Sequence, residues 1–168
     1  MKRLWAPWRM EYINSMVAEN SGECIFKIGD DPALDREKLV LHRGKTAFVM
    51  MNKYPYNNGH LLIAPYRHTG EFCELTEEEY LEMQKLIALC LRAEQTCIKP
   101  HGFNIGLNLG RVAGAGVDDH LHYHIVPRWD GDTNFMPLFG EVKVISEALE
   151  RTYDKIKAEI DKQLKIKN

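Results

Sequence analysis

Three histidines alternate with other residues in one short segment of the chain, residues 120–126. They are His120, His122 and His124. Side chains of a β-strand point alternately to its two faces, so a strand here places all three imidazoles on one face. Three buried imidazoles need three sets of hydrogen-bond partners, so ordinary core packing does not explain the pattern. The segment is therefore the candidate site of chemistry.

Three interpretations of this histidine row are open. It could be a polar cluster without function, or a pair of metal ligands completed by a residue from elsewhere in the chain. It could also be catalytic. A neutral imidazole, with a pKa near ~6.5, is nucleophilic near pH 7 and becomes cationic readily beside a phosphate. A row of imidazoles can therefore attack, orient and neutralise an anionic phosphorus centre.

A glycine-rich loop precedes the histidines. Gly110, Gly114 and Gly116 lie close together in the chain. Glycine lets backbone N–H groups approach an anion closely. Such a loop is a weak signal by itself, because most are simply turns. Beside three aligned histidines it favours the catalytic interpretation, with a phosphate as the bound group.

The elements that must position these residues begin with a predicted β-hairpin. Residues 46–51 are apolar and carry β-branched and aromatic side chains, which is typical of a strand. Residues 54–59 have the composition of a turn. Residues 60–64 form a second strand that ends at Pro65. We expect the two strands to pair antiparallel.

A helix, two strands and a last helix are predicted to follow. Thr76 and Glu79 form the pattern of a capping box, and apolar residues then recur at helical spacing until about Pro100. Strands are expected over residues 102–109 and 120–126. Ser146 would cap the last helix, whose apolar stripe comprises Leu149, Tyr153, Ile156, Ile160 and Leu164. This order of elements indicates an α+β fold with an antiparallel sheet.

The 168 residues suit a single domain. We place an N-terminal extension over residues 1–21, where Pro7 begins a helix that runs to about Asn20. The core covers about residues 22–130, and a C-terminal helical extension covers residues 142–168.

Composition argues against several classes of function. The net charge of −2 is not that of a general nucleic-acid binder, which carries a basic excess. No apolar run approaches the ~20 residues of a membrane span, and the N-terminus lacks the apolar stretch of a signal peptide. The four cysteines form no Cys-x-x-Cys pair, which favours reduced thiols. We expect a cytoplasmic protein that binds neither nucleic acid nor membranes.

Residues 120–126 resemble the motif of the histidine-triad (HIT) family, in which three histidines alternate with apolar residues. Further segments resemble the same family and lie in its order, namely residues 24–28, 52–60, 76–98 and 104–108. The resemblance covers roughly residues 22–130. Residues 4–9 and 126–137 resemble a narrower branch, which includes bacterial proteins that split diadenosine tetraphosphate with water or with inorganic phosphate.

The resemblance implies an HIT-like fold, in which a long helix packs on an antiparallel sheet, with helical extensions at both ends of the chain. It also implies covalent catalysis. His122 would attack the α-phosphorus to form a nucleotidyl-histidine. His124 would help the leaving group depart, and His120 would orient the site by hydrogen bonds. Water or phosphate would then release the nucleotide.

The resemblance assigns further residues to nucleotide binding. Asn52 would hold the ribose hydroxyls. Asn108 would hold phosphate, together with the backbone of Gly114, Ala115 and Gly116. The side chains that would pack on the base are Ile25, Phe26 and Met50. Many family members have Gln followed by Ser or Thr shortly before the triad, whereas residues 115–119 contain no hydroxyl group, so backbone N–H groups must substitute.

No resident cofactor is expected, although a Mg²⁺ ion could accompany a polyphosphate substrate. Some family members hold structural zinc through a Cys-x-x-Cys pair, a histidine after the hairpin and the first histidine of the triad. Cys24 and His68 match two of these positions, but Lys27 stands at the second cysteine position, so we do not expect zinc. Family members are usually homodimers that pair the long helix, and we expect a homodimer here.

The predicted function is therefore cleavage of dinucleoside polyphosphates, such as diadenosine tetraphosphate, at the α-phosphorus. Hydrolysis is slightly favoured, and phosphorolysis with inorganic phosphate is an open alternative. Hydrolysis of nucleoside phosphoramidates and non-catalytic nucleotide binding are two further alternatives.

Overall fold

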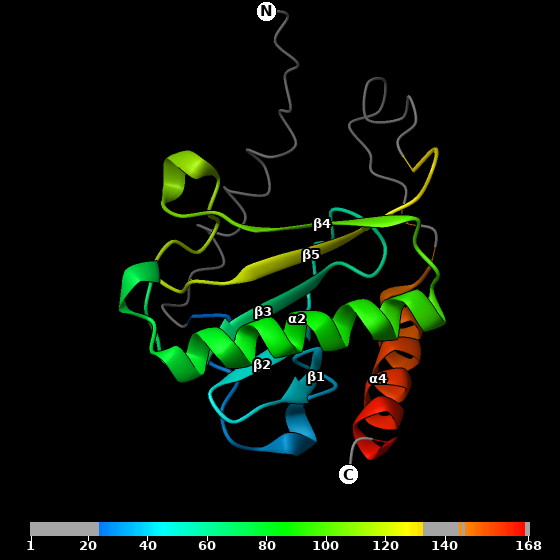
Figure 1. Ribbon diagram of the computed structural model, residues 1–168, viewed down its shortest axis with the longest axis horizontal. Helices are drawn as coiled ribbons and strands as arrows, with labels where there is room; N and C mark the ends of the chain where they lie inside the picture. The colour runs from blue at the N-terminus through cyan, green and yellow to red at the C-terminus, as the bar shows by residue number, and fades with distance from the viewer. Residues whose placement is uncertain (1–23, 133–144, 146, 167–168) are drawn as a thin grey trace, which may run out of the picture.

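The computed structural model describes residues 24–132, 145 and 147–166, and Figure 1 shows a long helix lying across one face of a sheet. The strands are β1 (Val40–Arg43), β2 (Ala47–Met51), β3 (Leu61–Pro65), β4 (Gly102–Leu107) and β5 (Tyr123–Arg128). The helices are α2 (Glu77–Cys97), α4 (Leu149–Ile166) and the 3-10 turns η1 (Pro32–Leu34), η2 (Phe72–Glu74) and η3 (Arg111–Ala113). The predicted α+β class is confirmed.

The five strands form one antiparallel sheet in the order β1-β2-β3-β5-β4. The predicted hairpin is the β2–β3 pair. Leu62 on β3 lies opposite Met50 on β2 and opposite His124 on β5. Directly opposed residues share a face of the sheet, so the register places one histidine of the row in the middle of the sheet, beside two apolar side chains.

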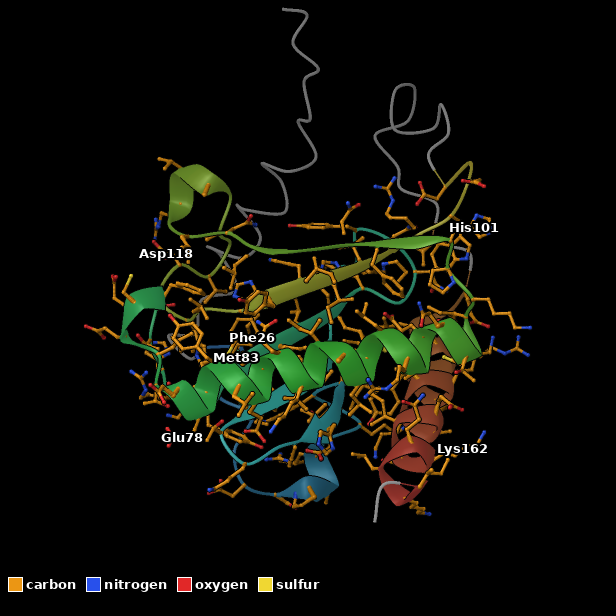
Figure 2. All side chains as sticks on the ribbon, viewed as in Figure 1. Phe26, Glu78, Met83, His101, Asp118 and Lys162 are labelled. Carbon is orange, nitrogen blue, oxygen red and sulfur yellow. The ribbon has the colours of Figure 1, made fainter. Side chains whose placement is uncertain are left out.

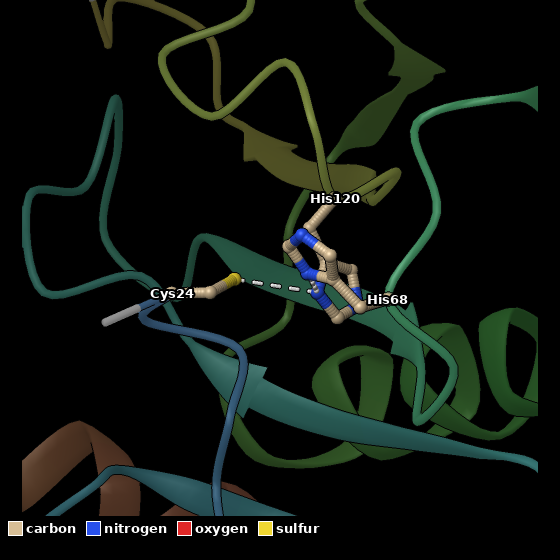
Figure 3. Close-up of side chains that lie close together, drawn as sticks. All are labelled: Cys24, His68 and His120. Carbon is tan, nitrogen blue, oxygen red and sulfur yellow. Dashed lines mark hydrogen bonds between the residues drawn. The ribbon is translucent and has the colours of Figure 1, made fainter. Parts of the chain in front are cut away.

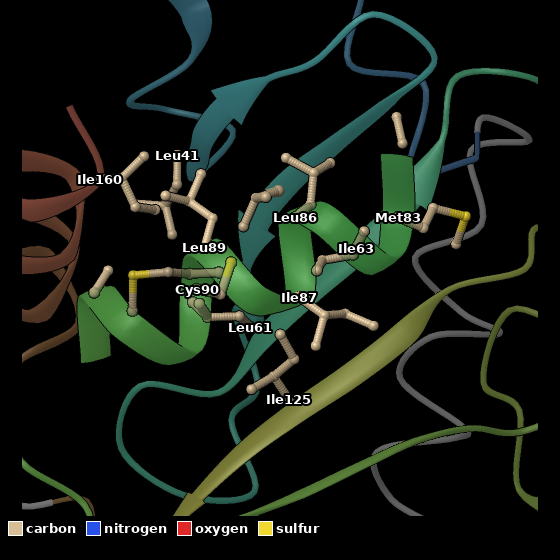
Figure 4. Close-up of a cluster of buried hydrophobic side chains, with 14 of the residues drawn as sticks. Leu41, Leu61, Ile63, Met83, Leu86, Ile87, Leu89, Cys90, Ile125 and Ile160 are labelled. Carbon is tan, nitrogen blue, oxygen red and sulfur yellow. The ribbon is translucent and has the colours of Figure 1, made fainter. Parts of the chain in front are cut away.

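The two faces of the sheet carry different cores. On one face, the buried side chains of α2 pack on alternate residues of the strands, including Leu61, Ile63 and Ile125 (Figure 4). On the other face a smaller cluster comprises Phe26, Ile28, Val40, Phe48, Met50, Leu62 and Ala64. Because both faces of the central strands are buried, their sequences are continuous apolar runs. The histidines lie on the face with the smaller cluster.

Helix α2 begins where the sequence predicts. Thr76 is its N-cap, and Thr76 and Glu79 form a complete capping box, which satisfies backbone N–H groups of the first turn. The apolar stripe of the last helix is also confirmed. Tyr153, Ile156 and Ile160 of α4 are buried against the main core. The hydroxyl of Tyr153 donates to the carbonyl of Val40 at 2.8 Å, which ties α4 to β1.

The prediction for the histidine strand is wrong at both ends, because β5 covers Tyr123–Arg128 and not residues 120–126. The N–H of Leu121 donates to the carbonyl of Thr69 at 2.7 Å, outside the sheet. The ring of His120 is bonded to the carbonyl of Pro65 at 2.9 Å. These bonds hold the chain at residues 120–122 against the loop after β3, so ladder pairing begins only at Tyr123.

Strand β1 is an element that the sequence analysis did not anticipate. It is short, with two buried residues followed by two half-buried ones, and its register with β2 is irregular between Val40 and His42. The N-terminal extension, including the helix predicted from Pro7, and the predicted cap Ser146 lie outside the described residues. No helix among the described residues is long and apolar enough to cross a membrane.

Candidate active site

A cleft of about 370 Å³ opens on the sheet face opposite α2. The predicted site residues that line it are Ile25, Phe26, Met50, Asn52, Gly114, Gly116, His122 and His124. Three predicted site residues, His120, Asn108 and Ala115, lie outside its lining. Figure 2 shows Asp118, which follows the glycine loop, near one end of the sheet and His101 near the other.

His122 is held in one tautomer of its neutral imidazole. Its Nδ1 lies 2.8 Å from the backbone carbonyl of His120, and a carbonyl only accepts hydrogen bonds, so Nδ1 carries the proton. The Nε2 atom therefore has the free lone pair. Only 8% of His122 is exposed, and burial lowers the pKa of its imidazole. A buried, neutral imidazole with a free Nε2 lone pair is suited to act as a nucleophile.

His124 is held in the opposite tautomer by a fourth histidine, His60. The Nδ1 of His60 accepts from the backbone N–H of Tyr56 at 3.0 Å, so the proton of a neutral His60 is on Nε2. This Nε2 lies 2.9 Å from Nδ1 of His124. His124 must therefore accept at Nδ1 and carry its own proton on Nε2. Its ring centroid is 4.8 Å from that of His122.

The neutrality of His60 is secured by its environment. His60 is fully buried, and burial with two neighbouring imidazoles lowers its pKa to about 3. Sequence reasoning assigned His60 only to a predicted strand and gave it no role. Its one signal was a histidine at the start of an otherwise apolar strand, directly after a turn.

His120 orients its neighbours from behind the cleft. It is 2% exposed, and its ring lies 5.0 Å from the ring of Phe26. Phe26 also contacts His122, with ring centroids 4.6 Å apart. His120 thus positions His122 in two ways, through its own carbonyl oxygen and through the shared contact with Phe26.

The glycine loop has the backbone geometry that only glycine adopts readily. Gly110 and Gly114 have φ values of 76° and 97°, which allow the tight turn of η3 between them. The N–H of Gly114 donates to the carbonyl of Arg111 at 2.9 Å, and that of Ala115 donates to the carbonyl of Gly110 at 3.4 Å. Among the described residues, the N–H of Gly116 has no such acceptor. Gly116 lines the cleft, so its N–H is a candidate donor to an anion bound there.

The two predicted asparagines differ in position. Asn52 lines the cleft and is 8% exposed, and its Oδ1 accepts from the backbone N–H of Tyr54 at 2.9 Å. Its amide nitrogen lies 3.3 Å from Nδ1 of His60. Asn108 instead donates to the carbonyl of Gly114 at 3.4 Å, and so supports the loop from outside the cleft.

Cys24, His68 and His120 converge from three segments of the chain (Figure 3). Because Nε2 of His120 donates to Pro65, its Nδ1 has a free lone pair. The Sγ of Cys24 lies 3.3 Å and Nδ1 of His68 lies 3.1 Å from this atom. One sulfur and two nitrogen ligand atoms within 4.8 Å of one another fit three positions of a zinc site.

The zinc fit has support beyond the three ligand atoms. Nε2 of His68 lies 3.5 Å from Oδ2 of Asp119, the type of contact by which a carboxylate orients a metal-binding histidine. The expectation that the chain holds no metal is therefore not confirmed. The sequence analysis matched Cys24 and His68 to zinc positions of the family but rejected zinc because of Lys27, whereas the three remaining positions do come together.

Comparisons with known proteins show which family the chain resembles. Residues 34–131 match the model of the HIT domain family. The AP-4-A phosphorylase of Mycobacterium tuberculosis is 41% identical over 157 residues, which cover 90% of this chain and 80% of that protein. An adenosine 5'-monophosphoramidase of Schizosaccharomyces pombe is 32% identical over 108 residues, 62% of this chain and 74% of that protein.

A solved structure shares the fold. The zinc-bound histidine triad family protein of Mycobacterium smegmatis superposes with a TM-score of 0.62 at 19% identity, covering 95% of this chain and 99% of that one. The likeness confirms the predicted fold, a long helix packed on an antiparallel sheet.

Proposed function

The chain belongs to the HIT domain family, and on that premise we propose that it is an enzyme that cleaves dinucleoside polyphosphates at the α-phosphorus through His122. The proposal depends on one observation: His122 and His124 are opposite tautomers in the cleft. His122 has a free Nε2 lone pair, and His124 carries a proton on Nε2. A nucleophile and a hydrogen-bond donor for the leaving oxygen, side by side, are suited to displacement at phosphorus.

The first step follows from these positions. Nε2 of His122 attacks the α-phosphorus and forms a P–N bond, while the bond from phosphorus to the bridging oxygen breaks. The departing oxygen accepts a hydrogen bond from Nε2–H of His124, which stabilises its developing negative charge. The N–H of Gly116 would donate to the phosphate oxygens, and Ile25, Phe26 and Met50 would enclose the base. An acceptor then breaks the P–N bond and releases the second nucleotide.

We propose inorganic phosphate as the acceptor, on the strength of the 41% identity to the mycobacterial protein. The residues of the cleft themselves admit water or phosphate equally. The test is product analysis with diadenosine tetraphosphate. ADP and ATP appearing only with phosphate would establish phosphorolysis, whereas AMP and ATP in plain buffer would establish hydrolysis. His122→Ala should abolish turnover and keep nucleotide affinity, and turnover by this variant would refute the mechanism.

A second candidate activity is cleavage of the phosphorus–nitrogen bond of nucleoside phosphoramidates. It is favoured by the identity of 32% to the fission-yeast phosphoramidase. The same nucleophile serves, because only the leaving atom changes from oxygen to nitrogen. Turnover of adenosine 5'-phosphoramidate, without turnover of diadenosine tetraphosphate in either buffer, would establish this activity in place of the first.

The proposed chemistry routes no step through a metal, because His122 supplies the nucleophile and His124 donates the hydrogen bond to the leaving oxygen. A zinc ion held by Cys24, His68 and His120 would have a structural part, since it would cross-link the segment before Phe26 to the residues before His122. Elemental analysis of the purified protein tests this site. Zinc near one equivalent, lost in Cys24→Ala with the His122 chemistry retained, would place zinc at this cluster.

We propose a homodimer in which β4 and α2 meet their copies. Strand β4 is at the edge of the described sheet, and it carries Ile105 with 44% exposure on the same face as the apolar core. Leu81 of α2 is 56% exposed. An unpaired edge strand with exposed apolar residues favours pairing with another chain. Sedimentation of the wild type and of Ile105→Lys tests this, since the lysine should produce monomers.

A cytoplasmic location and a small nucleotide as the binding partner complete the proposal. All four cysteines are free thiols in the structure, as suits a reducing compartment. The cleft has the size of a small-molecule pocket, and the chain has no basic excess that would favour nucleic acid.

A further inference from the structure

The cleft is small for the proposed substrate. Its volume of about 370 Å³ lies near the lower end of the range of roughly 300–1,000 Å³ in which proteins enclose one small ligand. A dinucleoside polyphosphate carries two nucleosides joined by a phosphate chain. If one nucleotide occupies the cleft, the second must lie at the rim, on the side where the leaving group departs.

His124 marks the side of the cleft on which the leaving group departs. Tyr56 is the residue next to His124 at the edge of the cleft. Its ring is stacked on His124, with centroids 5.7 Å apart and planes at 15°, and its centroid is 4.6 Å from that of His60. Tyr56 lines the cleft, yet 41% of it is exposed. One part of the ring therefore rests on the histidines, and the rest is accessible to a ligand.

The position of Tyr56 is set before any ligand binds. Its backbone N–H donates to Nδ1 of His60 at 3.0 Å, and the turn before it is held by the bond from Tyr54 N–H to Asn52. A preorganised aromatic ring gives a base a stacking surface at a low cost in conformational entropy.

Lys53 adds a positive charge to the lining of the same cleft. It is exposed, it lines the cleft, and its Nζ lies 5.7 Å from the centroid of the Tyr54 ring. The phosphate chain between the two nucleosides carries several negative charges, and its distal phosphates must leave the cleft past this rim. An ammonium group there is suited to bind them.

We propose that Tyr56 and Lys53 form a subsite for the leaving half of the dinucleotide, in which Tyr56 stacks on the second base and Lys53 binds the distal phosphates. The inference rests on the proposed function and goes beyond it, because it makes these two residues the reason why the enzyme prefers a substrate with two nucleosides. The competing explanation is that Tyr56 does no more than support the ring of His124.

Kinetics with two substrates separate these explanations. Diadenosine tetraphosphate and adenosine 5'-tetraphosphate share the reacting phosphate and the phosphate chain, but only the first has a second base. Tyr56→Leu should lower kcat/KM for the dinucleotide by roughly tenfold, as expected from losing one base–aromatic stack, and leave the mononucleotide unchanged. Tyr56→Phe should restore the dinucleotide rate. Equal losses on both substrates would overturn the subsite.

Matched controls address folding and charge. Tyr66 has a similar exposure of 39% but lies outside the cleft lining, so Tyr66→Leu should change neither substrate. Lys53→Met should weaken both substrates and reduce the salt dependence of KM, because both carry the phosphate chain. Lys45→Met, an exposed lysine in the β1–β2 turn, should have no such effect. An unchanged salt dependence in Lys53→Met would remove Lys53 from the subsite.

Binding to the inactive His122→Ala protein distinguishes failure of the inference from failure of the proposed function. Calorimetry should show diadenosine tetraphosphate binding more tightly than AMP, and Tyr56→Leu in this background should remove most of the difference. Equal affinities for the two ligands in His122→Ala would overturn the subsite alone. Absence of binding by both would overturn the proposed function, and the subsite with it.

Discussion

The positions of protons on four imidazoles set the chemistry of the site at the scale of single residues. A backbone carbonyl fixes the proton of His122 on Nδ1, and His60 fixes that of His124 on Nε2. The two rings are identical in composition and adjacent in space. Their different partners make one a nucleophile and the other a hydrogen-bond donor, just as a metal-binding or catalytic histidine is oriented through its second nitrogen.

The pH dependence of the reaction should reflect the environment of His122. Burial lowers the pKa of this imidazole below its usual value near 6.5, so the neutral, nucleophilic form persists in more acidic solution. We expect kcat/KM to stay on its plateau as the pH falls through 6.5 and to decline only below it. A pH profile with a substrate of constant charge measures this, and a decline centred above 6.5 would contradict it.

His60→Gln should impair the departure of the leaving group more than the attack. Without the His60 donor, His124 can shift its proton to Nδ1, so that its Nε2 no longer donates to the departing oxygen, and losing one such donor typically costs about 10²–10³-fold in kcat. The loss should be large with diadenosine tetraphosphate, whose departing phosphate keeps its negative charge on oxygens beside His124, and smaller with a p-nitrophenyl ester of AMP, whose departing charge is spread over the aromatic ring. His101→Gln, at the far end of the sheet, is the control, and equal losses on both substrates would exclude the role of His124 as donor to the leaving oxygen.

At the scale of elements, the turn between β2 and β3 connects the site to the helical layer. Asn52, Tyr56 and His60 all belong to this turn or its ends, and their side chains and backbone bond to one another. Gly59 in the turn has a φ of +78°, and a Cβ there would lie 2.7 Å from Cδ1 of Ile98 and 2.9 Å from Oε1 of Glu94. The turn therefore sits directly against the end of α2.

Gly59→Ala should destabilise the protein and reduce activity together. The left-handed backbone costs an alanine about 1–2 kcal/mol, and the contact with Ile98 adds to this. Gly131→Ala is the matched control, because Gly131 has a φ of +74° with nothing within 4 Å of the added Cβ. Urea denaturation should show a larger loss at Gly59 than at Gly131. Equal losses would show that backbone strain alone is responsible.

At the scale of the whole molecule, one buried carboxyl group stands out in the interface between α2 and the rest of the fold. Glu94 is 0% exposed, and neither side-chain oxygen has a partner among the described residues. Burial raises the pKa of this carboxyl well above its usual value. The folded protein therefore keeps Glu94 protonated at pH values where the unfolded chain, with a pKa near ~4.3, is ionised.

This linkage makes the free energy of unfolding fall as the pH rises above about 4.3, because the folded state then holds a proton that the unfolded state has lost. Glu94→Gln replaces the carboxyl group with an amide that does not titrate, so this pH dependence of the free energy of unfolding is removed. We expect the wild type to lose stability relative to Glu94→Gln as the pH rises above about 4.3, measured by urea denaturation at each pH. Parallel stability curves for the two proteins would show that Glu94 ionises without cost.

Most of the secondary structure could be predicted because its signals are local. The capping box at Thr76, the apolar stripe of α4 and the β2–β3 hairpin each depend on residues within a few positions of one another. Strand β1 was missed because only two of its residues are buried, so it lacks a clear apolar pattern. The start of β5 was misplaced because hydrogen bonds to the distant residues Pro65 and Thr69 hold the chain before Tyr123.

The candidate site also has one part that local sequence predicts and another part that depends on contacts between distant residues. The alternation of residue types predicted that His122 and His124 would face the same way, because an extended chain directs every second side chain to one face. Both line the cleft, although His122 lies just before β5. Their proton positions depend on His60, which lies 64 residues from His124 in the chain. The zinc-like cluster joins Cys24 to His120 across 96 residues and His68 to His120 across 52. Contacts at such separations leave no periodic trace in a sequence, so the role of His60 became visible only in the folded chain, and Cys24 and His68 could be related to the triad only through the family resemblance.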